Sequence, residues 1–226
     1  MIGKLENLLI PGRVLSDRMP SYLRVIHPHL PFLTERKETV EGQLTQCPKP
    51  LQDAFKDTLS AVMLPDSGQP TQPRTIDQAY RSLVDWELLD SPASPAEQRA
   101  ADVTYIQTLL LMAIEADSRS PSAGGPPKEA ILGRAVSGAV SKKLYQFRPK
   151  NQAPPSHTPE MEENLPLRIW WGLVLLDRWN AISTGSHALI PKRHIIAPPG
   201  LREHLGDRFY YLLRACPSAQ VSEVHG

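Results

Sequence analysis

Residues 162–191, EENLPLRIWWGLVLLDRWNAISTGSHALIP, contain three of the four tryptophans of the chain and its densest apolar run. Large aromatic side chains stabilise a protein strongly when they are buried, so we expect Trp170 and Trp171 in a core. Asp177 and Arg178 stand inside the same run, where a charged pair must reach water or be satisfied by a partner. This segment is therefore the one that decides the fold.

The spacing predicts one helix from about Asn164 to Thr184. Asn164 can cap the helix, and Pro166 falls in the first turn, where proline is tolerated. Gly185 is suited to the left-handed conformation that ends many helices.

Helical patterns also occur on both sides of this segment. Apolar residues recur at spacings of three and four, and proline-rich stretches at residues 64–75, 118–128 and 148–159 separate them. Residues 21–33 predict a short helix that runs into a proline turn. Thr75 is a plausible N-cap, and Ser94-Pro95-Ala96-Glu97 is typical of a helix start. The further predicted helices cover residues 50–63, 76–89, 95–116, 129–147 and 201–215.

No segment shows the alternation of a strand, so the predicted class is all-α. We expect an irregular multi-helix domain of six or seven helices with proline-rich loops. The predicted division is an N-terminal segment at 1–20, one domain at 21–215 and a C-terminal tail at 216–226.

Bulk composition narrows the function classes. Lys and Arg number 25 and Asp and Glu 24, which leaves a net charge of +1. This balance argues against direct nucleic-acid contact, which usually requires a basic excess. No apolar run approaches the roughly 20 residues that span a bilayer. The first 20 residues make a poor signal peptide, so we expect a soluble intracellular protein without a membrane partner.

Candidate chemistry in the sequence is sparse. His27 and His29 flank Pro28, but no third ligand stands at a suitable spacing, which argues against a metal site. Two cysteines, Cys47 and Cys216, are too few for a disulfide framework or a four-cysteine zinc site. No glycine loop, nucleophilic serine or acid–base pair emerges. We therefore predict no catalytic, cofactor-binding or metal-binding residues.

The pair Asp177 and Arg178 allows two interpretations. Arg178 could stack on an indole or form a fork with a carboxylate, while Asp177 could bond a neighbouring helix end. Alternatively, the two residues form interhelical ion pairs that fix the register of the helix. We favour the second interpretation, because structural ion pairs often create such patterns.

The Trp-Trp segment resembles the best-marked motif of the fungal-specific transcription factor domain. That domain is the helical middle homology region of fungal regulators that carry a binuclear zinc cluster. The motif of that family has an arginine-containing lead-in, two tryptophans, an apolar stretch, Asp-Arg and a glycine. The matching residues are Arg168, Trp170, Trp171, Leu173, Leu176, Asp177, Arg178 and Gly185.

A second motif, nearer the N-terminus, also resembles that family. In the family this motif consists of a tyrosine, a His-Pro pair and a further proline. It consists here of Tyr22, His27, Pro28 and Pro31. Three departures mark a divergent copy: a weaker basic lead-in at 165–167, Ser186-His187 after the glycine, and Lys142-Lys143 where Gly-Leu-His-Arg is usual. The chain also stops early, so the domain is expected to be truncated at its C-terminal end.

The resemblance implies a nuclear regulatory domain that modulates RNA polymerase II transcription. The zinc of that family lies in a six-cysteine cluster, which two cysteines cannot build, so no cofactor is expected here. The implied partners are other transcription-regulatory proteins, a covalently linked DNA-binding domain or a small-molecule effector. Two alternatives stay open: a helical ligand-binding protein or enzyme with a pocket between loops, and a protein-interaction scaffold.

Overall fold

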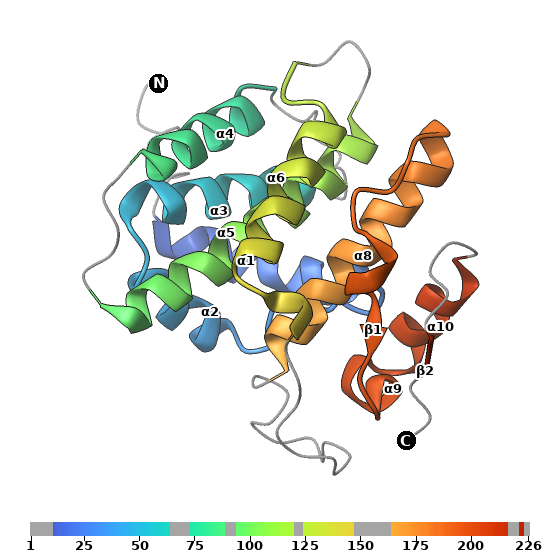
Figure 1. Ribbon diagram of the computed structural model, residues 1–226. Coiled ribbons are helices and arrows are strands. Elements are labelled where there is room, and N and C mark those ends of the chain that lie inside the picture. Colours follow the sequence, from blue (N-terminus) through green and yellow to red (C-terminus); the bar gives the residue numbers. More distant parts are fainter. Residues whose placement is uncertain are drawn as a thin grey trace, which may run out of the picture.

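The computed structural model describes residues 11–63, 73–88, 94–119, 124–146, 164–216 and 222–223. This part of the chain is almost entirely helical, which confirms the predicted all-α class (Figure 1). Its helices are α1 (Pro11–Val25), α2 (Lys37–Thr45), α3 (Lys49–Met63), α4 (Pro73–Glu87), α5 (Pro95–Ser118), α6 (Lys128–Ser141), α8 (Leu165–Thr184), α9 (Leu201–Leu205) and α10 (Asp207–Ala215), with single 3-10 turns η3 (Leu144–Gln146) and η4 (Lys192–His194).

The helices pack around α5 and α8. α5 contacts α2, α3, α6 and α8, while α3 also contacts α1 and α4. In Figure 1, α8 lies between this group and the C-terminal pair α9 and α10. A single apolar cluster joins all parts, from Leu15 in α1 to Cys216 after α10. One shared core therefore extends from α1 to the end of α10.

The start of α5 follows the sequence prediction. Ser94 Oγ accepts a hydrogen bond from the backbone N–H of Glu97 at 3.2 Å, and the Glu97 carboxylate accepts one from the Ser94 N–H at 3.0 Å. This is a complete capping box with Pro95 at the first helical position. α6 also lies close to α5. A Cβ atom added to Gly138 would lie 2.8 Å from Ile106 Cδ1 of α5.

Several boundaries differ from the predictions. α4 begins at Pro73, so Thr75 lies inside the helix and the predicted N-cap was wrong. α2 was not predicted, and the helix predicted at residues 201–215 is broken at Gly206, whose φ is +81°. A left-handed φ interrupts helical hydrogen bonding, which explains the break. The predicted loop at residues 148–159 lies outside the described residues.

Described residues on both sides of the expected domain take part in its fold. The short helix predicted at residues 21–33 is the end of the longer α1, and its earlier residues Leu15 and Met19 are buried in the common core. On the C-terminal side, β1 (Ile196–Ala197) pairs in parallel with β2 (Ser222–Glu223). This parallel pair of two-residue strands is the strand content of the described chain, and no strand was predicted there.

Asp57 in α3 provides a first prediction. Burial, followed by the charge of Asp53, raises its pKa from 3.8 to about 6. A raised carboxyl pKa favours the protonated folded state, so this contribution to stability is present below about pH 4 and lost as the pH rises through 6. At pH 7, Asp57→Asn should raise the free energy of unfolding by about 1 kcal/mol, after allowance for solvent screening.

Urea denaturation of the wild type and of Asp57→Asn between pH 4 and pH 7 measures this difference. The gain should shrink toward zero near pH 4. The exposed Asp17 of α1 provides the control, and Asp17→Asn should follow the wild type throughout. A constant gain across the range would show that the effect does not come from the titration of Asp57.

Candidate functional site

The tryptophan helix α8 is buried on nearly all sides. Trp170 is 2% exposed and Trp171 is fully buried, as are Leu173 and, to within 1%, Leu176. A helix that is apolar around its circumference fits a central position in a bundle. Gly185 ends the helix with φ +66° and ψ 18°, the left-handed conformation predicted for it. These residues of the tryptophan motif therefore build the core and its boundary.

Asp177 and Arg178 bind backbone rather than another helix. The Asp177 carboxylate accepts hydrogen bonds from the N–H groups of Leu189 at 2.8 Å and Ile190 at 3.0 Å. The Arg178 guanidinium donates to the Ile190 carbonyl oxygen at 2.7 Å. The favoured interpretation, interhelical ion pairs, was therefore wrong. The pair instead fastens the segment after Gly185 against its own helix, and we call it the Asp-Arg clamp.

Tyr22 of the N-terminal motif fixes the turn that follows α1. Its hydroxyl group donates a hydrogen bond to the Leu30 carbonyl oxygen at 2.9 Å and accepts one from the Leu33 N–H at 3.3 Å. The side chain is fully buried and packs edge-to-face on Phe32. Two prolines in this turn remove backbone donors, so a side-chain hydroxyl supplies the link across it.

Tyr22→Phe should lower the free energy of unfolding by about 1–2 kcal/mol, because the Leu30 and Leu33 backbone groups lose a buried partner. Chemical denaturation measures this change. Tyr211→Phe is the matched control, since Tyr211 is 55% exposed, and it should have little effect. Equal stability of the two variants would contradict the assigned role of the Tyr22 hydroxyl group.

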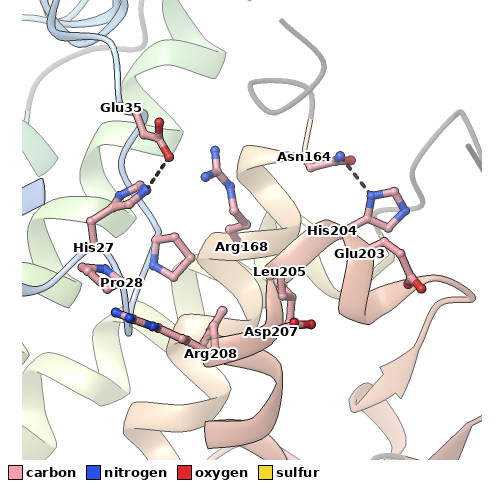
Figure 2. A pocket seen from close by; sticks show the side chains of 13 residues that line it. His27, Pro28, Glu35, Asn164, Arg168, Glu203, His204, Leu205, Asp207 and Arg208 are labelled. Atoms are coloured by element: carbon pink, nitrogen blue, oxygen red, sulfur yellow. Dashed lines mark hydrogen bonds and ion pairs between the residues drawn. The ribbon is translucent and has the colours of Figure 1, made fainter. Parts of the chain in front are cut away.

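The two sequence motifs meet at a cavity of about 430 Å³. Its lining includes His27, Pro28 and Pro31 of the N-terminal motif and Arg168 of the tryptophan motif. The remaining wall comes from Asn164 before α8 and from the α9–α10 segment, residues 203–209. Figure 2 shows the Arg168 side chain directed into this space. Arg168 is 2% exposed, so the cavity has a buried cation in its wall.

Two polar pairs flank Arg168. His27 Nε2 lies 3.2 Å from Glu35 Oε1, and Asn164 Nδ2 lies 3.1 Å from His204 Nδ1 (Figure 2). The bond to His204 replaces the helix cap predicted for Asn164, which makes no side-chain cap. Together the two pairs hold side chains from α8, α9 and the turn after α1 around the guanidinium group.

The electrostatics of the cavity follow from burial. Burial lowers the pKa of His27, and the charge of Arg168 lowers it further against the opposing effect of Glu35. Burial also lowers the pKa of His204. Because both imidazoles then favour the neutral form, the positive charge inside the cavity is that of Arg168. The carboxylates of Glu35, Glu203 and Asp207 belong to exposed residues and form a rim.

Sequence reasoning missed part of this site. Glu35, Glu203 and Asp207 were not singled out, and the helix break at Gly206 that turns residues 203–209 into a cavity wall was not foreseen. Gly206, which stands three residues before Phe209 inside the predicted helix, was the available signal. Of the predicted residues, Arg168, His27, Pro28 and Pro31 come together at the cavity. The Asp-Arg clamp and the two tryptophans do not line it.

Other candidate groups carry no site. Burial raises the pKa of the Cys47 thiol, whose sulfur contacts the Thr104 hydroxyl group at 3.3 Å, so it is a poor nucleophile. Within the described ranges, no three His, Cys, Asp or Glu side chains gather as metal ligands. None of the described helices is both long and apolar enough to cross a membrane.

Comparison with known proteins finds similarity to a transcriptional regulatory protein. The chain is 27% identical over 181 residues to an uncharacterized transcriptional regulatory protein of Schizosaccharomyces pombe. The match covers 77% of this chain and 20% of the relative, so the chain spans about a fifth of the length of the protein it matches. No family model matches the chain. No solved structure matches it either. The chain is thus an all-helical domain similar to part of a fungal transcriptional regulator.

Proposed function

We propose that this chain is a regulatory domain of a fungal transcription factor that acts in the nucleus and modulates RNA polymerase II transcription. The observation that carries the proposal is its similarity, over most of its length, to part of a fungal transcriptional regulatory protein. The resemblance of α8 to the tryptophan motif of the fungal-specific transcription factor domain supports the same assignment. DNA contact would come from a separate domain, because the balanced charge of this chain does not favour it.

Two surfaces of the fold offer ways to transmit regulation. The cavity around Arg168 is large enough for a small effector. At the other end of α8, Trp179, Ile182 and Leu189 are 36%, 55% and 46% exposed. Large apolar side chains left exposed together are typical of contact surfaces. They support contact with another part of a longer regulator or with a partner protein.

A reporter assay tests the proposal. The chain would be placed between a bacterial repressor DNA-binding domain and a strong activation segment, and expressed in yeast with a reporter bearing the matching operator. We expect output several-fold different from that of a fusion with a flexible linker in its place. The unstable variant Trp171→Ala should abolish the difference at equal protein level. Equal output from the native chain and the linker would overturn the proposal.

One observation favours the alternative that the chain is an enzyme. Titratable groups converge on the cavity, as an active site requires. The described residues that line it include no Ser, Thr, Cys, Tyr or Lys, so a nucleophile among them would have to be a carboxylate or an imidazole. The two imidazoles are instead bonded to Glu35 and Asn164. This lining suits the binding of a ligand better than its chemical conversion.

A further inference from the structure

We propose that the surface formed by the end of α8, the segment that follows Gly185 and the turn after α6 binds an acidic peptide segment that also carries apolar side chains. We call it the basic–apolar surface, and it consists of Lys143, Ile182, Leu189, Lys192 and Arg193. The consequence for transcription rests on the proposed function, for which this inference states the chemistry of the partner. The binding itself does not depend on that function.

The Asp-Arg clamp holds the apolar part of this surface together. It fastens the backbone of Leu189 and Ile190 against α8. Ile182 lies one turn beyond Arg178 on the same face of that helix, so it stands beside the fastened segment. In Figure 1, this segment runs back along α8 toward β1. The side chains of Ile182 and Leu189 are both exposed, which leaves apolar area available for a contact.

A ring stack connects the two basic parts of the surface. The His194 ring of η4 lies on the Tyr145 ring of η3, with ring centroids 4.4 Å apart and an angle of 21° between the planes. Lys192 and Arg193 belong to η4, and Lys143 directly precedes η3. The stack therefore brings together cations from two segments that lie far apart in the sequence.

These cations have no acid to balance them among the described residues. All three are exposed, and none of them forms an ion pair in the described part of the chain. The neighbouring Lys142 differs, because its ammonium group lies 2.9 Å from a carboxylate oxygen of Asp102. Residues 178–202 contain neither Asp nor Glu. Although the whole chain is nearly neutral, this surface is positive and would attract an acidic partner.

Lys143 adopts a backbone conformation that favours glycine. Its φ is +56°, in the left-handed region, and among the described residues it is the one with a Cβ atom and a positive φ. A Cβ atom is strained in this region, so glycine would suit the end of α6 better. The fold therefore gains nothing from a lysine at this position, whereas an anionic partner would use its charge.

The combination of cations and aliphatic side chains selects a peptide. The phosphates of a nucleic acid would meet the cations but would leave Ile182 and Leu189 uncovered. A peptide in which Asp or Glu stands among Leu or Phe satisfies both groups. Its apolar side chains would cover the two aliphatic residues, while its carboxylates would accept charge-assisted hydrogen bonds from Lys192 and Arg193.

Matched peptides test the proposal on the full chain by fluorescence anisotropy. The first probe is about 12 residues long and repeats the unit Asp-Asp-Leu-Phe. A second peptide has Asn in place of Asp, and a third has Ser in place of Leu and Phe. We expect the first peptide to bind about ten-fold or more tightly than either of the others, and its affinity to fall as salt is added.

Two results of this experiment would overturn the proposal. One is that the first peptide does not bind, or binds no more tightly than the other two. The other is that a duplex DNA with the same number of negative charges binds more tightly than the first peptide, because the surface would then be a nucleic-acid site.

Substitutions on the surface locate the binding. Arg193→Glu should weaken binding of the first peptide about ten-fold, because an attractive charge becomes a repulsive one. Leu189→Ser should weaken it several-fold through the loss of apolar contact. Arg81→Glu is the matched control, since it changes the net charge equally at an exposed position of α4, which lies apart from α8 in Figure 1. Equal weakening by Arg81→Glu and Arg193→Glu would contradict the assigned surface.

Lys143→Gly separates binding from stability. Because glycine suits the left-handed φ, the midpoint of urea denaturation should stay the same or rise. Loss of the charge should nevertheless weaken the first peptide several-fold. An unchanged affinity for the peptide in this stable variant would show that Lys143 does not belong to the binding surface.

Failure of this proposal is distinguishable from failure of the proposed function. Peptide binding is measured on the chain by itself, and regulation is measured in the reporter assay. Peptide binding without any effect of the chain on transcription would reject only the regulatory role. A transcriptional effect without peptide binding would reject only the assignment of the partner.

Discussion

Replacing Trp171 with alanine should lower the free energy of unfolding by about 3–5 kcal/mol. Trp171 is fully buried in the centre of α8, so the variant leaves a cavity the size of an indole ring in the common core. Within the described part of the chain, its indole N–H has no hydrogen-bond acceptor. The loss therefore measures packing alone. Urea denaturation followed by circular dichroism provides the measurement, because the signal does not depend on the removed fluorophore.

Trp179 is the matched control on the same helix. It is 36% exposed and lies two turns further along α8. Trp179→Ala should cost less than about 1 kcal/mol, as substitutions at exposed positions usually do. A small change in Trp171→Ala, equal to that of the control, would show that the paired tryptophans are not what holds the core together.

The fold could be predicted from sequence to the extent that it depends on local patterns. α8, α3 and the capping box of α5 are specified by residues three or four positions apart, and these elements appear where expected. α2 was missed because its buried face has only Val40 and Leu44, which is too little periodicity to stand out. The helix break at Gly206 and the start of α4 at Pro73 depend on backbone conformations that residue propensities do not determine.

The candidate site could not be predicted, because it joins residues far apart in the chain. Asn164 bonds His204, which is 40 positions away, and Arg168 shares a cavity with His27 from the turn after α1. Each motif by itself predicted only a local structure. Helix packing then brings the motifs together, and no spacing in the sequence encodes that meeting. Tyr22 was likewise recognised as part of a motif, while its two bonds across the proline turn became visible only in the structure.

Removing the Asp177 carboxylate should lower the free energy of unfolding by as much as Trp171→Ala does. The sequence indicated that this acid was special but suggested the wrong partner, since it binds the Leu189 and Ile190 N–H groups. Hydrogen bonds to a charged group contribute about 1.5–3 kcal/mol each, so Asp177→Ala should lower the free energy of unfolding by about 3–5 kcal/mol. Asp177→Asn keeps one acceptor oxygen and should lose about half of that. Urea denaturation of both variants gives the values.

Hydrogen exchange places the effect at the Asp-Arg clamp. In Asp177→Asn, the amides of Leu189 and Ile190 should exchange faster, while amides in the middle of α5 should change only as global stability does. Asp85→Asn is the control, because Asp85 is an exposed acid of α4. Since Arg178 still bonds the Ile190 carbonyl oxygen, the segment should loosen rather than detach. Unchanged exchange at both amides, with stability equal to that of the control, would mean that the segment after Gly185 is held by its apolar contacts, chiefly those of Ile190, which is 1% exposed.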